Sequence, residues 1–384
     1  MDMKFFSAAM CILLLLDLLA LRLCSYIGLY DRKQGRKLLY GTLLAWTAVY
    51  INHAAFPYWR ESLAESIGFW AAMAGYAWCT AIAAGTPAAA AAALRHRYRK
   101  QSGTVMKTAV RLVYMALLAA AAWGFTLGSL PLTVVKKDFS YANLPKSLNG
   151  YKIAQISDMH MGVYISAHDF SKALDEAAAA GADKVVITGD LVDEMSMLED
   201  IEPILKEKSR FFPDGIDYIY GNHEHRRDFE AITDMLRRTP VRILKNEAYL
   251  AKEGAVPFYI AGVDYPEKKG KEMDEERQEY MKEAMAFVPP GAFTLLLAHH
   301  SDCLEDGFSY AVPLTLAGHT HGGQITIGGK NLFSFGYPYL RGTYSRGESV
   351  GYVNRGAGHW LPIRIGCSRE ITIFTLHANV NREK

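Results

Sequence analysis

Four long apolar stretches in the first third of the chain constrain its architecture more than any other feature. A helix needs about 20 mostly apolar residues to cross the roughly 30 Å hydrocarbon core of a membrane, because each residue adds about 1.5 Å. The stretches cover residues 5–30, 38–59, 66–94 and 112–135. They predict a membrane domain of about four transmembrane helices in residues 1–130. Gly85 and Pro87 predict a kink or a helix end in the third stretch.

The distribution of basic residues predicts the orientation of these helices. Lys and Arg residues in short loops stay on the cytoplasmic side of a membrane. The loops after the first and third stretches carry ten Lys and Arg residues, whereas the opposite side carries four. Both termini, and the residues after the fourth stretch, are therefore expected outside the cytoplasm. Asp17 lies in the first stretch and is expected to pair with a basic residue or to face neighbouring helices.

The rest of the chain has the composition of a soluble domain. Residues 1–130 contain 13 Lys and Arg against 5 Asp and Glu, whereas residues 131–384 contain 29 against 35. A slightly acidic domain gives no support for nucleic acid binding. No CxxC spacing occurs, so Cys303 and Cys367 are expected to be free thiols. These patterns do not specify an oligomeric state.

Strand-like and helix-like patterns alternate after Gly150. Six apolar runs of strand length are bounded by Gly, Asp, Asn or His. They cover residues 152–157, 184–188, 216–220, 258–263, 293–298 and 314–317. Helices are predicted after Ser166 and at 195–209, 226–238 and 271–287. This alternation predicts an α/β domain over residues 131–384, with parallel first strands. Short glycine-rich strands at 324–327, 349–354 and 370–376 predict a second, more antiparallel sheet packed on the first.

Residues that can bind metal ions follow five of these strands. Because ligands collect beyond the carboxyl ends of strands in open α/β sheets, we expect these side chains to share one pocket. The candidate ligands are Asp158, His160, Asp190, Asn222, His299, His319 and His321. Oxygen and imidazole ligands without thiolates suit Mn, Fe or Zn. A carboxylate can bridge two ions about 3.5–4 Å apart, and Asp190, from the middle strand, is the predicted bridge.

The ordered motifs DMH, GDLVD, GNHE, AHH and GHTH resemble those of the calcineurin-like metallophosphoesterase family over roughly residues 131–384. The resemblance implies a two-sheet αββα sandwich and two divalent metal ions, with Mn favoured. It implies that the first ion is held by Asp158, His160, Asp190 and His321. The second ion would then be held by Asp190, Asn222, His299 and His319. His223 would be the nearby acid or transition-state stabiliser.

The chain also resembles a bacterial membrane-associated branch of that family, which includes cell-wall-linked phosphodiesterases and UDP-diacylglucosamine hydrolase-like enzymes. Where that branch reads H-x-P-D and P-E-I, this chain has residues 299–302 (HHSD) and 369–371 (REI). These departures remove no predicted metal ligand. They alter the residues expected to line the substrate-binding surface, for which His300 and Gly322 are candidates. Protein phosphatases read GDxVDRG, and Glu194 in place of the Arg argues against that activity.

Together these patterns predict a membrane-bound phosphoesterase with its catalytic domain outside the cytoplasm. A metal-bridging hydroxide would attack phosphorus, and His223 would protonate the leaving oxygen. Asp193 and Glu224 are expected to orient the ligands. The substrate is expected to be a phosphodiester, pyrophosphate or phosphomonoester, lipid-linked or not. Two alternatives remain open: a cytoplasm-facing UDP-diacylglucosamine pyrophosphate hydrolase-like enzyme, and a non-catalytic metal-binding membrane sensor or scaffold.

Overall fold

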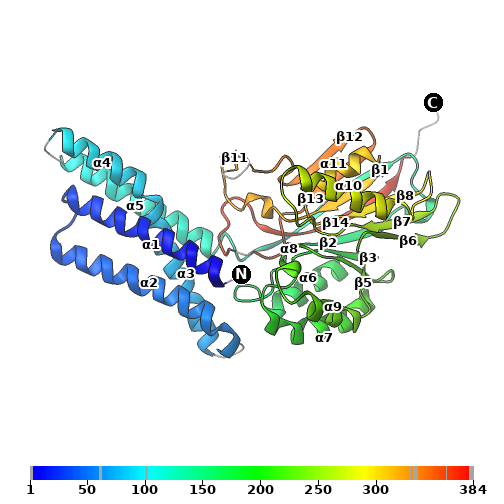
Figure 1. The fold of residues 1–384 in the computed structure, drawn as a ribbon, viewed down its shortest axis with the longest axis horizontal. Helices are drawn as coiled ribbons and strands as arrows, with labels where there is room; N and C mark the ends of the chain where they lie inside the picture. Colours follow the sequence, from blue (N-terminus) through cyan, green and yellow to red (C-terminus); the bar gives the residue numbers. More distant parts are fainter. Residues whose placement is uncertain are drawn as a thin grey trace. The chain divides into compact units, whose positions relative to one another are not determined.

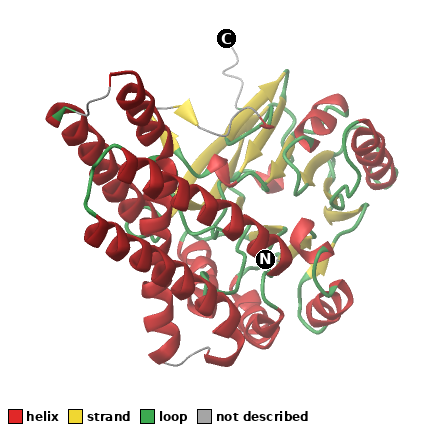
Figure 2. Ribbon diagram, turned by 60° about the vertical axis from the view of Figure 1, so that its left-hand side comes forward, coloured by secondary structure: helices red, strands yellow, loops and turns green. Residues whose placement is uncertain are grey.

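A computed structural model shows how the chain divides. It describes residues 3–59, 63–99, 103–328, 330–331, 336–359 and 361–379. Two compact units emerge: Met1–Leu130 together with Leu361–Ile365, and Pro131–Trp360 together with Gly366–Lys384. The segment Leu361–Ile365 belongs to the first unit, and within it the Arg364 N–H donates to the Gly124 carbonyl at 3.0 Å. We call the two parts the helical unit and the α/β unit (Figures 1 and 2).

The helical unit follows the predicted apolar stretches only in part. Its described helices are α1 Met3–Tyr26, α2 Arg32–Trp59, α3 Leu63–Ala84, α4 Thr86–Arg99 and α5 Thr104–Phe125. The break between α3 and α4 falls at Gly85, as predicted. Within the described residues, two stretches are long and apolar enough to cross a membrane, Ser66–Arg99 and Thr104–Phe125, rather than the predicted four. Helix α2 includes Asn52 and His53, which are more polar than a spanning segment favours.

The fourth apolar stretch is not the helix that the sequence predicts. Helix α5 begins at Thr104 and ends at Phe125, so Lys107 and Arg111 lie inside it rather than in a loop. Residues Leu132–Tyr141 form strand β1 instead. Pro131 cannot continue a helix, and β1 pairs in parallel with the C-terminal strand β14.

Asp17 on α1 faces a neighbouring helix. It is fully buried, and its carboxylate accepts a 2.9 Å hydrogen bond from the Trp46 indole nitrogen of α2. This matches one of the two expectations for an acid in an apolar helix. Cys303 and Cys367, in the α/β unit, are buried and form no disulfide within the described residues, also as expected.

The α/β unit contains two six-stranded sheets. The first has the order β1-β14-β2-β3-β4-β5, and the second β12-β13-β9-β8-β7-β6. The first sheet contains β1 Leu132–Tyr141, β2 Lys152–Ile156, β3 Lys184–Thr188, β4 Ile216–Ile219, β5 Arg242–Ile243 and β14 Arg369–Ala378. The second contains β6 Glu247–Lys252, β7 Phe258–Gly262, β8 Phe293–Leu297, β9 Leu314–Ala317, β12 Gly342–Arg346 and β13 Ser349–Val353. A small antiparallel pair joins β10 Thr326–Ile327 and β11 Lys330–Asn331.

The predicted strands exist, but their grouping into sheets was wrong. Strands β2, β3 and β4 are parallel neighbours in one sheet, and β7, β8 and β9 are parallel neighbours in the other. The late strands do not form a separate antiparallel sheet. Strand β13 lies parallel to β9, and β14 lies antiparallel to β2 and parallel to β1. Each sheet therefore has three parallel neighbouring strands at its centre. The C-terminal strands β14 and β13 lie beside these strands in the first and second sheet, respectively.

The two sheets pack face to face around one hydrophobic core. Ile153 and Val186 of the first sheet lie in the same buried cluster as Phe258 and Leu295 of the second. The helices are α6 Ala167–Ala179, α7 Leu198–Lys208, α8 Asn222–His225, α9 Phe229–Arg237, α10 Lys271–Met285 and α11 Cys303–Ser309. Single 3-10 turns cover Lys146–Leu148, Met195–Met197, Ser209–Phe211 and His321–Gly323. Helices α6, α7 and α9 lie beside the first sheet, and α10 and α11 beside the second (Figure 1).

Helix α6 shows how local sequence sets these boundaries. The Ser166 hydroxyl accepts a hydrogen bond from the Asp169 backbone N–H, and the Asp169 carboxylate accepts one from the Ser166 backbone N–H. This reciprocal cap satisfies two N–H groups that a helix start leaves open. Gly181, just past the end, has φ +73°, which favours glycine.

Candidate metal centre

The seven predicted ligands lie at the carboxyl ends of strands from both sheets. Asp158 and His160 follow β2, Asp190 follows β3, Asn222 follows β4, His299 follows β8, and His319 and His321 follow β9. The sheets meet beside them, because Gln155 Nε2 of β2 donates a 2.9 Å hydrogen bond to the Ala317 carbonyl of β9. Residues about 160 positions apart are thereby brought to one place, as the strand-end pattern predicts.

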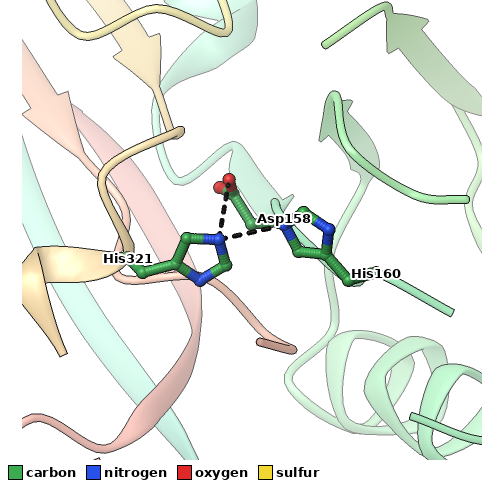
Figure 3. Close-up of side chains that lie close together, drawn as sticks. All are labelled: Asp158, His160 and His321. Atoms are coloured by element: carbon green, nitrogen blue, oxygen red, sulfur yellow. Dashed lines mark hydrogen bonds and ion pairs between the residues drawn. The ribbon is translucent and has the colours of Figure 1, made fainter. Parts of the chain in front are cut away.

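The first group consists of Asp158, His160 and His321, which point toward one another (Figure 3). The Nε2 atoms of His160 and His321 are 2.9 Å apart, and His321 Nε2 is 3.5 Å from Asp158 Oδ1. The three residues are at most 3% exposed. The carboxylate of Asp158 is held in place by the Ser157 hydroxyl at 2.5 Å and by the His319 backbone N–H at 3.0 Å.

The second group consists of Asp190, His299 and His319. The His299 Nε2 atom lies 3.2 Å from both Asp190 Oδ2 and His319 Nδ1. The other nitrogen of the His299 ring, Nδ1, lies 2.8 Å from the Thr188 carbonyl and fixes the ring orientation. Burial lowers the pKa of His299, but the carboxylates of Asp190 and Asp158 outweigh it and raise the pKa to about 10. The carboxylates thus favour positive charge at this point.

Asp190 lies between the two groups. Its Oδ2 atom is 3.6 Å from His160 Nε2 and 3.2 Å from His299 Nε2. Its other oxygen, Oδ1, accepts a 2.8 Å hydrogen bond from the His223 backbone N–H. Burial alone would raise the pKa of Asp190, yet His299 and His223 hold it well below its ordinary value. Asp190 is therefore an ionised carboxylate in position to be shared.

Asn222 provides a direct test of whether the pocket suits a cation. Its side chain is 4% exposed, and its Oδ1 atom is buried without a hydrogen-bond partner among the described residues. A buried carbonyl oxygen without a partner costs roughly 1–3 kcal/mol, which a cation would offset. Facing imidazole nitrogens and buried carboxylates complete a donor set that suits Mn, Fe or Zn. The residues present therefore fit divalent metal ions.

The backbone at these ligands is strained. Positive φ angles occur at Asp158, His160, Asp190, His319 and His321, with values from 50° to 74°. For residues other than glycine this conformation costs of the order of 1–3 kcal/mol each and is concentrated at functional sites. The strain directs the side chains away from the positions that a regular strand end would give them.

Two glycines allow the ligand loops to approach each other. A Cβ atom on Gly318 would overlap the Ser157 hydroxyl and the Asp158 carboxylate. A Cβ atom on Gly221 would overlap Asp190 Oδ1. The glycines of the predicted GHTH and GNHE motifs are therefore required because ligand carboxylates occupy the space of their missing side chains.

Glu224 orients the Asp190 loop, as expected from the sequence. It is fully buried, and its carboxylate accepts hydrogen bonds from the backbone N–H groups of Asp190 and Gly221 at 2.9 and 2.8 Å. It also accepts from Leu191 and Val192 at 2.8 and 3.2 Å. One side chain thus satisfies four backbone donors and holds the ends of β3 and β4 together.

His223 is held by a network that sequence reasoning found only in part. Its Nδ1 atom bonds the carboxylate of Asp193, which was expected to orient the site. Arg227 was missed: its Nε donates to the Asp193 carbonyl at 2.7 Å and its Nη2 to the Asp193 carboxylate at 3.0 Å. Burial would raise the pKa of Asp193, but His160 and His223 hold it well below its ordinary value. No local pattern links residue 227 to residue 193.

The two predicted substrate residues lie in different surroundings. His300 is buried beside His319, with ring centroids 4.8 Å apart, and burial, His299 and Arg277 lower its pKa to about 3. It is therefore neutral. Gly322 follows His321, but its N–H donates to the Thr320 hydroxyl at 3.2 Å. Both substrate roles stay predictions.

Two aromatic residues beside His300 were missed by sequence reasoning. Tyr265 and Tyr337 lie with ring centroids 5.6 and 5.7 Å from that of His319. A signal existed for Tyr265, because the strand at 258–263 also ends in a metal-capable residue, Asp264, and Tyr265 follows it. Tyr337 lies in a segment without a predicted element.

Buried carboxylates and imidazoles at the meeting edge of two sheets form a centre that fits divalent metal ions. A family model described as calcineurin-like phosphoesterase matches residues 151–323. An uncharacterized metallophosphoesterase of Helicobacter pylori is 31% identical over 274 residues, covering 68% of this chain and 69% of that protein. The chain belongs to the calcineurin-like phosphoesterase family. It is a metal-dependent phosphoester hydrolase, so its substrate is a phosphate ester.

Two further relatives match about two thirds of this chain or more. The uncharacterized metallophosphoesterase YkuE of Bacillus subtilis is 28% identical over 277 residues, covering 68% of this chain and 92% of that protein. A Danio rerio protein named transmembrane protein with metallophosphoesterase domain is 28% identical over 288 residues, covering 72% of this chain and 64% of that protein. The sequence resemblance to this family is thus confirmed.

Proposed function

We propose that the protein is a membrane-bound phosphoesterase that works with two divalent ions, Mn in preference to Fe or Zn. Asp158, His160 and His321 would hold one ion, and Asn222, His299 and His319 the other. Asp190 would hold both, and its place between the two groups carries this proposal. When bound, such ions supply Lewis acidity at the phosphoryl oxygens and make water acidic enough to attack phosphorus at neutral pH.

The exposure of the site indicates how an ester reaches it. Asp158, His160, His299 and His321 are buried, whereas the side chain of His223 is 13% exposed and His319 is half-buried. An ester would therefore approach from the side of His223 and His319. Asp193 holds His223 Nδ1, which leaves Nε2, 4.0 Å from Asp190 Oδ2, to protonate the leaving oxygen.

The loss of His223 is expected to reveal this proton transfer. With Mn²⁺, His223→Asn should lower kcat by roughly 100- to 10,000-fold for phenyl phosphodiesters. The loss should be smaller for bis-p-nitrophenyl phosphate, because p-nitrophenolate leaves without protonation. Steady-state kinetics on both esters measures the difference. His377→Asn is the control, because this exposed residue pairs with Asp138 away from the ligands. Equal kcat in His223→Asn and wild type would contradict the proposed role.

A non-catalytic sensor or scaffold is the alternative that the sequence alone leaves open. The paired His223 and Asp193 favour the enzyme, because metal binding alone does not require a proton donor beside the ligands. Mn²⁺ binding without turnover of any mono- or diester would favour the sensor.

We further propose that the helical unit anchors the enzyme, with the α/β unit outside the cytoplasm. The facing ends of the two candidate spans are basic, since Arg97 and Arg99 end α4 and Lys107 and Arg111 lie early in α5. Connections rich in Lys and Arg stay on the cytoplasmic side of a membrane, so the residues after Phe125 would lie on the opposite side. This argument holds for two spans as well as four. A lipid-linked phosphodiester or pyrophosphate is the substrate that a membrane anchor favours.

Reporter fusions test this orientation. Alkaline phosphatase fused after Lys384 should be active, and green fluorescent protein fused there should be dark, because each folds on one side of the membrane. The opposite result would place the domain in the cytoplasm. That result would favour the alternative of a UDP-diacylglucosamine pyrophosphate hydrolase-like enzyme.

A further inference from the structure

We infer that the site selects phosphate esters whose organic group carries a flat ring, as in aryl or nucleoside phosphates. The ring would stack on Tyr265 and Tyr337, which together with the buried His300 we call the ring wall. This inference rests on the proposed function and adds a substrate class to it.

The ring wall surrounds one of the proposed ligands. The ring centroids of Tyr265, His300 and Tyr337 lie 5.6, 4.8 and 5.7 Å from that of His319. The His300 centroid is 5.9 Å from that of Tyr265 and 6.1 Å from that of Tyr337. Tyr265 and His300 are 35 residues apart in the sequence, and His300 and Tyr337 are 37 residues apart. The fold rather than the local sequence therefore gathers the three rings. A phosphate bound near His319 would bring its organic group beside these rings.

The rings are held in place before any ligand binds. The Tyr337 hydroxyl lies 3.3 Å from His319 Nε2, and His300 Nδ1 accepts a 3.2 Å hydrogen bond from the Asp302 N–H. The Tyr265 N–H donates to the Asp264 carboxylate at 2.9 Å. That carboxylate is in turn held by His225 Nε2 at 2.8 Å. A fixed surface loses little conformational freedom when a ring stacks on it.

The ring wall lies on the accessible side of the site. Tyr265 and Tyr337 are half-buried, like His319, whereas His300 and the ligands of the first group are buried. The two tyrosines therefore provide the accessible part of the ring wall. Arg226 adds positive charge next to this surface. Arg226 follows His225, whose ring is hydrogen-bonded to Asp264, the residue before Tyr265. Within the described residues, the Arg226 guanidinium has no carboxylate partner. An anionic ester would therefore be drawn toward the ring wall.

The chemistry of the ring wall favours a flat group over an alkyl chain. The two phenol rings offer aromatic faces, on which bases and aryl rings stack. Removing one such aromatic side chain lowers affinity by roughly 5- to 100-fold for a stacked base. An alkyl phosphate would gain little from the same surface, since it lacks a ring to stack.

Binding of product analogues tests the inference without relying on turnover. Calorimetric titration of the full-length, Mn²⁺-loaded protein would compare phenylphosphonate, which has no ester bond to hydrolyse, with ethylphosphonate and inorganic phosphate. Wild type should bind phenylphosphonate about 10-fold more tightly than ethylphosphonate. Tyr337→Leu and Tyr265→Leu should remove that preference and leave the affinity for inorganic phosphate unchanged. Tyr337→Phe keeps the ring, so it should keep the preference.

The outcomes separate the two proposals. Tyr310→Leu is the matched control, because Tyr310 is 43% exposed and lies outside the ring wall. Equal affinity of wild type for phenylphosphonate and ethylphosphonate would overturn the ring wall while leaving the metal centre intact. A preference that survives in both Leu variants would also overturn it. A loaded protein that binds no phosphate would instead contradict the proposed function.

Discussion

Asp190→Asn is expected to abolish phosphoesterase activity and to lower the metal content of the purified protein. The substitution keeps the size of the side chain but removes its negative charge. The charge is important because Asp190 Oδ2 lies within 3.6 Å of His160 Nε2 of the first ligand group and of His299 Nε2 of the second. An amide cannot bridge two ions as a carboxylate does, so we expect kcat to fall by about 1,000-fold or more. Assay of bis-p-nitrophenyl phosphate hydrolysis measures this change.

Folding and charge need separate controls in that experiment. The Asn variant should retain the hydrogen bond from the His223 N–H, because the amide oxygen still accepts it. Its circular dichroism spectrum should therefore match wild type. Asp234→Asn changes an exposed carboxylate of α9 and should leave activity within twofold of wild type. Wild-type activity in Asp190→Asn would show that this residue is not shared between ions.

Glu224→Ala is expected to destabilise the protein more than any other substitution at the site. It removes the carboxylate that satisfies the buried backbone donors of Asp190, Leu191, Val192 and Gly221. Unsatisfied buried donors cost roughly 1–3 kcal/mol each, and partial relaxation leaves a total of roughly 3–5 kcal/mol. For a domain of this size the unfolding temperature should fall by about 10 °C. Differential scanning calorimetry of the full-length protein measures the shift.

The conservative variant distinguishes hydrogen bonding from packing. Glu224→Gln keeps the volume but turns an NH₂ group toward backbone donors, so it should also lower the unfolding temperature. Glu230→Ala, on the exposed side of α9, should change it by less than about 2 °C. An unchanged unfolding temperature in both Glu224 variants would mean that these hydrogen bonds do not hold the Asp190 loop.

The strands that carry the ligands could be predicted because their signals are local. Each is a short apolar run followed directly by Gly, Asp or His, and all five occur within one residue of the expected boundaries, as does β7. Ser166 and Asp169 likewise mark the start of α6 within four residues. Since carboxyl ends of neighbouring strands lie together, the convergence of the ligand residues followed from these positions.

The grouping of strands could not be predicted, because it depends on contacts distant in sequence. Strand β1 pairs with β14 more than 200 residues later, and its apolar residues also suit a helix. The division between β4 and β7 into different sheets has no local signal. The same holds for Arg227 and Tyr337, whose roles depend on partners brought near by folding. The sequence indicates the ligands well and the surrounding side chains poorly.

Counting and characterising bound manganese tests the central claim most directly. Protein purified and loaded with Mn²⁺ should contain two ions per chain by elemental analysis. Its electron paramagnetic resonance spectrum should show a spin-coupled pair, because a shared carboxylate holds two ions about 3.5–4 Å apart. Asp190→Asn should lose the coupling. One uncoupled Mn²⁺ per wild-type chain would contradict the account.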